Sequence, residues 1–148
     1  MKKSFYILIF LFSFSQAHEF KAIFDCSSSN PKYIASRMML IEKTINMIEK
    51  DNEKAKFVLT LHGGCVPMVS KTYEDTTTDE DLPYISKAQE TITKLSKEKG
   101  VKIIACAMSL EANAIEKEDV LPFVAISKNS FLETIKYQNL GYALMPLN

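Results

Sequence analysis

The sequence has few cysteines, no surplus of charge of either sign, and no long apolar segment beyond its first residues. Three cysteines in 148 residues are too few for a miniprotein held together by disulfides. The 18 basic and 18 acidic residues balance, which argues against a general nucleic-acid binder, because such proteins need a basic surplus. After residue 17 no run is apolar and long enough to span a bilayer, so we expect no stable membrane insertion.

What is present is the composition of one globular domain. Apolar residues make up 47% of the chain, which excludes a disordered protein. The length suits a single domain with a core of its own.

The first 17 residues have the pattern of a secretory signal peptide. Two lysines precede a short apolar run over 5–12, and the segment SQA ends at Ala17. We predict cleavage after Ala17 and a mature domain over 18–148 that is periplasmic or secreted. A buried N-terminal strand or an uncleaved anchor is the alternative. An oxidising compartment permits disulfides, so the cysteines are interpreted with that in mind.

The remaining chain alternates strand-like and helix-like patterns. Short apolar runs predict strands at 20–24, 57–61, 101–105, 123–126 and 142–145. Helices are expected from Asn30-Pro31 to about residue 50, along the stripe Ile85, Ala88, Ile92 and Leu95, from Ser109 to about 115, and from Asn129 or Ser130 to Gly141. This alternation predicts a single-domain α/β fold, a layered parallel sheet with helices on both faces, similar to Rossmann and flavodoxin-like three-layer folds.

All three cysteines follow expected strands. Cys26 comes after the first, Cys65 shortly after the second, and Cys106 directly after the third. The carboxyl ends of parallel strands meet at one edge of a sheet, where open α/β folds place their ligand sites. Each cysteine can also be a small buried apolar side chain, an interpretation that suits Cys26 best and Cys106 least, and any two of the three can form a disulfide.

Cys106 has the most favourable chemical setting. Ser109 is a plausible N-cap for the helix that follows, and free N–H groups at a helix start stabilise an anion. A thiolate or persulfide is an anion, so we expect the pKa of Cys106 to fall and the thiol to become a nucleophile.

The segment His62-Gly63-Gly64-Cys65 is a second candidate element. His62 can act as a base or stabilise a nearby thiolate, or it can be an ordinary histidine at a strand end. With Cys65 and Met68 it can form a soft-metal site, the least favoured interpretation. No familiar cofactor or paired-cysteine zinc motif is present, so we expect no cofactor and no metal.

The segment over 100–120, GVKIIACAMSLEANAIEKEDV, resembles the DsrE/DsrF-like family of small sulfur-relay proteins, which includes TusD-like and YchN-like members. The likeness extends to Asp25 and Pro31, to His62-Gly63 and to Gly141-Tyr142. It implies a layered α/β fold, a homo-oligomer (a trimer or hexamer), and a persulfide-carrying cysteine at Cys106. The family often has arginine-glycine where this chain has Asn113-Ala114, and its well-known members are not exported.

Two functions follow from these patterns. The first is an exported sulfur carrier or sulfurtransferase, in which Cys106 takes sulfur from a sulfane donor and passes it to an exported acceptor protein. His62 assists, and Cys65 can resolve the persulfide as a disulfide. The alternative is a non-catalytic oligomeric binding or assembly module whose cysteines are structural.

Overall fold

The computed structural model describes residues 18–148, and the expected signal peptide at 1–17 lies outside them. Five parallel strands form one sheet in the order β4-β3-β2-β1-β5. Their bounds are β1 Glu19–Cys26, β2 Lys54–Leu61, β3 Lys102–Cys106, β4 Ala125–Ser127 and β5 Ala143–Leu147. All five expected strands are present, which confirms the α/β fold class.

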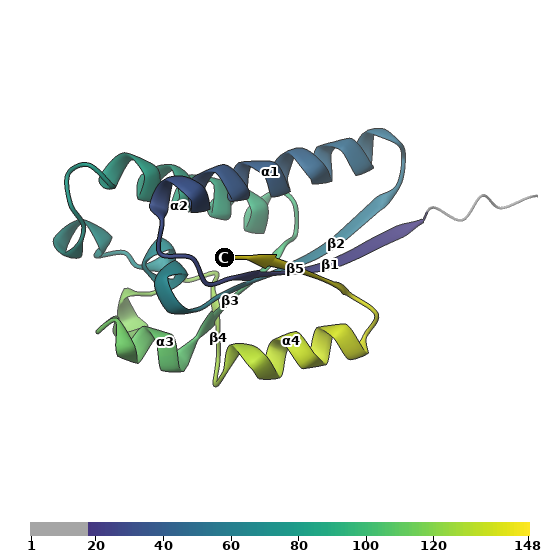
Figure 1. Cartoon of the computed structure of the whole chain (residues 1–148). Helices are drawn as coiled ribbons and strands as arrows, with labels where there is room; N and C mark the ends of the chain where they lie inside the picture. The colour runs from purple at the N-terminus through teal and green to yellow at the C-terminus, as the bar shows by residue number, and fades with distance from the viewer. Residues whose placement is uncertain (1–17) are drawn as a thin grey trace, which may run out of the picture.

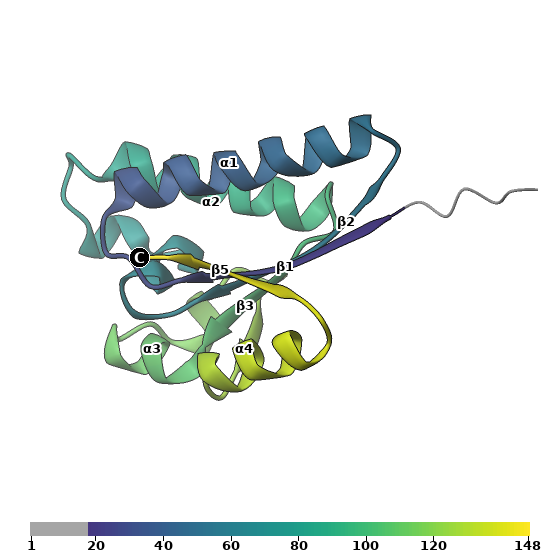
Figure 2. The ribbon, with the colours of Figure 1, turned by 45° about the vertical axis from the view of Figure 1, so that its right-hand side comes forward.

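The helices lie in two layers, one on each face of the sheet (Figures 1 and 2). One layer holds α1 (Pro31–Lys50) and α2 (Leu82–Lys97), and the other holds α3 (Ala107–Ala112) and α4 (Ser130–Asn139). Short 3-10 helices η1 (Gly63–Val69), η2 (Tyr73–Thr76) and η3 (Lys117–Asp119) lie in the connections.

The helix starts follow from side-chain caps. The Asn30 side chain accepts a 3.0 Å hydrogen bond from the Tyr33 N–H, and Pro31 opens α1. The Asn129 side chain caps α4 in the same way, by accepting a 2.8 Å hydrogen bond from the Phe131 N–H. Both caps agree with the sequence-based prediction.

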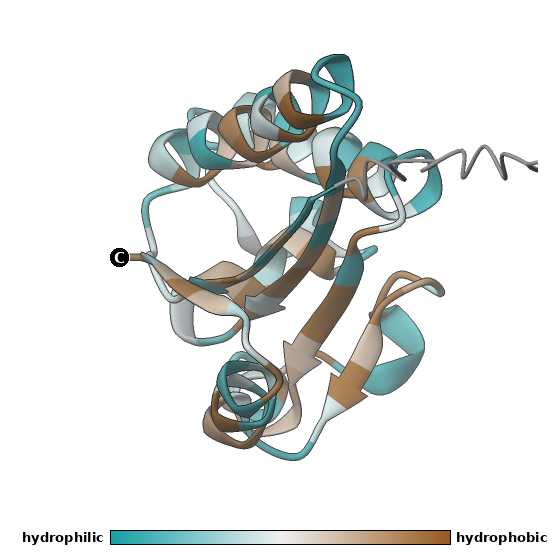
Figure 3. Ribbon diagram, turned by 90° about the vertical axis from the view of Figure 1, so that its right-hand side faces the viewer, coloured by the Kyte–Doolittle hydropathy of each residue, from teal (hydrophilic) through white to brown (hydrophobic). Residues whose placement is uncertain are grey.

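The core divides into two clusters because each strand has two faces. The larger cluster lies under α1 and α2 and contains the whole predicted stripe of α2, namely Ile85, Ala88, Ile92 and Leu95. The smaller cluster lies under α4 and contains Ile23, Val58, Ile104, Tyr137 and Tyr142. Figure 3 shows the apolar central strands between the two helical layers. In the part of the chain that is described, no helix is long and apolar enough to cross a membrane.

Several expected boundaries differ from the observed ones: β2 begins at Lys54 and not at residue 57, and β4 spans Ala125–Ser127 and not 123–126. Two further differences concern β5 and α3. The last strand continues through Pro146 instead of stopping before it. Because β5 is an edge strand, a proline there need not cost the sheet a hydrogen bond. The third helix starts at Ala107 and not at Ser109, because Cys106, the last residue of β3, is already the N-cap residue of α3.

Candidate functional site

All three cysteines lie at the carboxyl edge of the sheet, but Cys106 lies on the opposite face from Cys26 and Cys65. Cys26 and Cys65 form a disulfide, with their Cα atoms 5.9 Å apart, and both are fully buried in the cluster under α1 and α2. Cys106 is a free, buried thiol. It lies two residues after Ile104, which belongs to the cluster under α4, so its side chain points to that opposite face. The structure therefore selects one of the three possible pairings and leaves Cys106 apart.

Two helix starts converge on the Cys106 sulfur. The N–H groups of Met108 and Ser109, at the start of α3, and of Ser130, at the start of α4, donate to it, and so does the Ser109 hydroxyl. Burial raises the pKa of Cys106, but these donors together outweigh it and lower that pKa below its ordinary value. The arrangement stabilises an anionic sulfur.

Ser109 stabilises this sulfur, although not as the helix N-cap that the sequence suggested. It lies in the first turn of α3, where its backbone N–H and its hydroxyl both face Cys106. The hydroxyl oxygen accepts a 3.0 Å hydrogen bond from the Gly63 N–H. That bond leaves the hydroxyl proton free to point to the sulfur, so η1 and α3 together orient the donor.

His62 lies beside Cys106 and is paired with Asp25. Its Nε2 is 3.3 Å from Oδ1 of Asp25, which also accepts a 2.7 Å hydrogen bond from the Thr60 hydroxyl. The Asp25 carboxylate raises the pKa of His62; burial opposes this, and the charge of Cys106 adds to it. Burial raises the pKa of Asp25, but His62 and Thr60 outweigh it and lower that pKa. Each group therefore favours the charged form of the other.

Sequence reasoning did not assign Asp25 a chemical role. The available signal was a carboxylate in the otherwise apolar end of a strand, IFDC, one residue before a cysteine. Only the pairing of β1 with β2 brings it opposite Thr60 and within reach of His62.

The proposed soft-metal trio does not gather around one point. Cys65 is bonded to Cys26, and Met68 is buried in the cluster under α1 and α2. Within residues 18–148, no three His, Cys, Asp or Glu side chains come close enough together to hold a metal ion.

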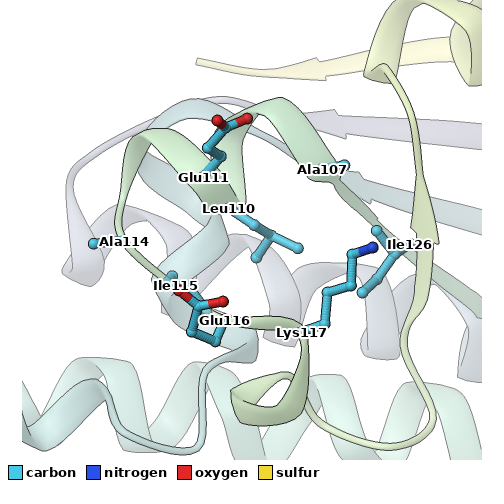
Figure 4. Close-up of a pocket in the computed structure, with 8 residues that line it drawn as sticks. All are labelled: Ala107, Leu110, Glu111, Ala114, Ile115, Glu116, Lys117 and Ile126. Carbon is cyan, nitrogen blue, oxygen red and sulfur yellow. The ribbon is translucent and has the colours of Figure 1, made fainter.

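A groove of about 380 Å³ runs beside α3 (Figure 4). Leu110, Lys117 and Ile126 point into it from three different segments. Ala107, which directly follows Cys106, also lines it, whereas Cys106 and His62 do not. The groove is therefore a neighbour of the thiol site and not the site itself.

The model of the DsrE/DsrF-like family matches residues 21–147, almost the entire described chain. The chain belongs to this family. An uncharacterized protein of Aquifex aeolicus (strain VF5) is 30% identical over 144 residues, which cover 97% of this chain and 63% of the relative. The chain thus spans just under two thirds of that relative's length.

A solved structure supports the same fold. The protein of unknown function MTH1491 from Methanobacterium thermoautotrophicum superposes with a TM-score of 0.59 and 16% identity. The match covers 87% of this chain and 98% of the other. At that identity the likeness shows the fold alone. The family model confirms the resemblance that the sequence shows over residues 100–120.

Proposed function

We propose that this DsrE/DsrF-like protein is a sulfur carrier that holds sulfane sulfur as a persulfide on Cys106. The observation that carries the proposal is the set of donors around the free thiol: three N–H groups and a hydroxyl from two helix starts. An anionic sulfur is what such a set stabilises, and membership of the family adds the expectation of sulfur relay.

Loading begins with attack of the Cys106 thiolate on a terminal sulfur of a polysulfide dianion. A new S–S bond forms on Cys106, the adjacent S–S bond of the polysulfide breaks, and its electron pair leaves with the shortened dianion. The Cys106 persulfide anion remains among the same N–H donors. No oxidant and no proton is consumed.

Discharge is the reverse type of step. An acceptor thiolate attacks the outer sulfur of the persulfide, a new S–S bond forms on the acceptor, and the bond to Cys106 breaks. Cys106 leaves as a thiolate, which the donors of α3 and α4 stabilise. His62 assists by placing positive charge beside it. Cys65 is bonded to Cys26 in this structure, so resolution of the persulfide by Cys65 needs prior reduction of that disulfide.

Intact mass after incubation with polysulfide tests the proposal. We expect a gain of one sulfur atom in the wild type and none in Cys106→Ser. The matched control is Cys26→Ala/Cys65→Ala, which removes the other two cysteines and should still load. Absence of a gain in the wild type, with Cys106 shown to be reduced, contradicts the sulfur carrier and favours a binding or assembly module.

We also propose that the mature protein is exported and begins at His18. Two observations support this: the buried Cys26–Cys65 disulfide suits an oxidising compartment, and β1 begins only at Glu19. Intact mass of the protein recovered from the periplasm or medium tests it. A chain that retains Met1 and stays in the cytoplasm contradicts it.

A further inference from the structure

Asp25 occupies an unusual place for a carboxylate. It is the penultimate residue of β1, between the buried Phe24 and the disulfide-bonded Cys26, and its side chain is only 21% exposed. Burying a carboxylate is unfavourable unless it is paired. Its partner is the imidazole of His62, whose Nε2 lies 3.3 Å from Oδ1 of Asp25, and the Thr60 hydroxyl donates a 2.7 Å hydrogen bond to the same oxygen.

The backbone on both sides of His62 is held in place. Its N–H donates a 2.9 Å hydrogen bond to the carbonyl of Cys26, and its own carbonyl accepts a 3.0 Å hydrogen bond from the Cys65 N–H. The Cys26–Cys65 disulfide joins these two partners covalently. The segment that carries His62 is therefore fixed to the strand that carries Asp25.

The sheet register then brings Cys106 next to this pair. Leu61 lies opposite Ala105 in the β2–β3 pairing, so His62 and Cys106 follow at the next position. Asp25, Thr60 and Cys106 lie on the face of the sheet that α4 covers, since each comes two residues after a member of the cluster there, namely Ile23, Val58 and Ile104. The ionisable groups that act on the imidazole are Asp25 from β1 and Cys106 from β3.

We propose that Asp25 is a positioning residue that acts through His62 on Cys106. Its carboxylate keeps the imidazole oriented and cationic beside the sulfur, so the thiolate, and the persulfide of the proposed function on which this role rests, keep a neighbouring positive charge at neutral pH. Asp25 itself does not touch the reacting sulfur in this role. Asp25, His62 and Cys106 lie at the carboxyl ends of three adjacent strands, β1, β2 and β3. In their ionised forms the three side chains are negative, positive and negative in that order, so neighbouring charges attract.

The test is the pH profile of Cys106 alkylation by iodoacetamide. In the oxidised protein only Cys106 has a free thiol. We expect Asp25→Asn to slow alkylation at pH 7 by about three- to tenfold, because each unit of rise in the pKa of Cys106 lowers the thiolate fraction about tenfold. At pH 10 the rate should match that of the wild type. His62→Gln should slow the reaction similarly, and Asp25→Asn should add little in that background.

A second measurement reports on His62 directly. The chain has two histidines, His18 and His62, so NMR titration of their ring protons gives two curves, and His18→Gln assigns them. Asp25→Asn should move the His62 midpoint to lower pH. If Asp25→Asn does not fold, Thr60→Val serves instead: it removes the 2.7 Å hydrogen bond that holds the Asp25 carboxylate and should shift the His62 midpoint.

Two results overturn the positioning role. One is an alkylation profile for Asp25→Asn that overlays the wild type. The other is an effect of Asp25→Asn that is equally large with His62→Gln present, which means that Asp25 does not act through His62. Neither readout needs a sulfur donor. Failure of sulfur loading in the wild type therefore tests the proposed function separately from the role of Asp25.

Discussion

At the residue scale, the Asp25–His62 pair makes stability depend on pH in a defined window. The pKa of Asp25 is lower in the folded chain, so its contribution is present above about pH 4 and is lost as the pH falls through that lowered value. The pKa of His62 is raised, so its contribution is present below about pH 6.5 and is lost as the pH rises through the raised value. Both contributions are complete only between these limits.

We therefore expect the free energy that the pair adds to folding to be larger at pH 5 than at pH 8.5. Urea unfolding of Cys106→Ser and of Cys106→Ser/Asp25→Asn/His62→Gln at both values measures it. The common Cys106→Ser background removes the thiol titration. An equal difference between the two proteins at pH 5 and pH 8.5 contradicts the ionic pair.

A second prediction at the residue scale concerns the backbone strain at Ala114. This residue follows the C-terminal end of α3 and has a φ of +53, in the left-handed region. The left-handed region costs an L-residue about 1–2 kcal/mol, whereas glycine adopts it freely but is more flexible when unfolded. We expect Ala114→Gly to raise the free energy of unfolding by about 0.5–1 kcal/mol. The matched control is Ala112→Gly in the last turn of the same helix, which should lower it by a similar amount. Urea midpoints measure both, and a loss of stability in Ala114→Gly contradicts the argument.

At the element scale, the Cys26–Cys65 disulfide links η1 covalently to the end of β1. It closes a loop of 39 residues that contains the whole of α1 and β2. A closed loop of this length constrains the unfolded chain, and its removal costs about 3–4 kcal/mol. We expect Cys26→Ala/Cys65→Ala to unfold at correspondingly lower urea concentration. Dithiothreitol should destabilise the wild type and leave the double variant unchanged; equal sensitivity of both proteins contradicts a stabilising disulfide.

The turn after β2 depends on close backbone packing at Gly64. A Cβ built there would lie 2.5 Å from Cα of Ser29 and 2.9 Å from the carbonyl oxygen of Ser28. The sequence suggested that these glycines allow close approach to a ligand, whereas at Gly64 the close approach is to the chain's own β1–α1 connection. Gly63, with φ +51, provides the turn itself.

We expect Gly64→Ala to destabilise the fold by about 1–3 kcal/mol through this clash. It should also change the Cys106 alkylation rate, because it displaces the turn whose Gly63 N–H orients Ser109. Gly141→Ala is the control: its φ of +81 strains an alanine, but a Cβ there meets nothing within 4 Å. The control should lose stability and keep the wild-type alkylation rate. An alkylation rate in Gly64→Ala equal to that of the wild type contradicts an influence of this turn on the thiol site.

At the scale of the whole molecule, the layer that covers the thiol also exposes large apolar side chains. Phe131, Leu132 and Ile135 of α4 and Met108 of α3 are 57–66% exposed. Exposed apolar groups that gather on one face favour association. We propose that this patch is the contact of a homo-oligomer, the assembly that the family resemblance implies.

Light scattering after size exclusion tests the assembly. We expect the wild type to be a trimer or hexamer, and Phe131→Ser/Ile135→Ser to shift it toward the monomer. The matched control is Met47→Ser, an equally exposed apolar residue on α1 across the sheet, which should leave the mass unchanged. A monomeric wild type contradicts the assembly, and a shift caused by Met47→Ser instead places the contact on α1.

Much of the fold could be predicted because its signals are local. The apolar stripe of α2, the Asn30-Pro31 start of α1 and the Asn129 cap of α4 each depend on residues within a few positions. The boundaries around Cys106 could not be predicted in this way. The sequence suggested Ser109 as the helix cap. In the structure β3 and α3 join at Cys106 without a linker, and the Ser109 hydroxyl donates a hydrogen bond to the Cys106 sulfur instead.

The sequence by itself determined the alternation of strands and helices, and hence the common edge at which the three cysteines lie, because hydrophobic periodicity and caps are local properties. Only the tertiary structure decided that Cys26 and Cys65 pair, that Cys106 stays free among the starts of α3 and α4, and that Asp25 meets His62. The physical reason is strand pleating and register. Neighbouring residues point to opposite faces, and partners that are far apart in the sequence, such as Cys26 and Cys65 with a separation of 39, meet only when the strands align.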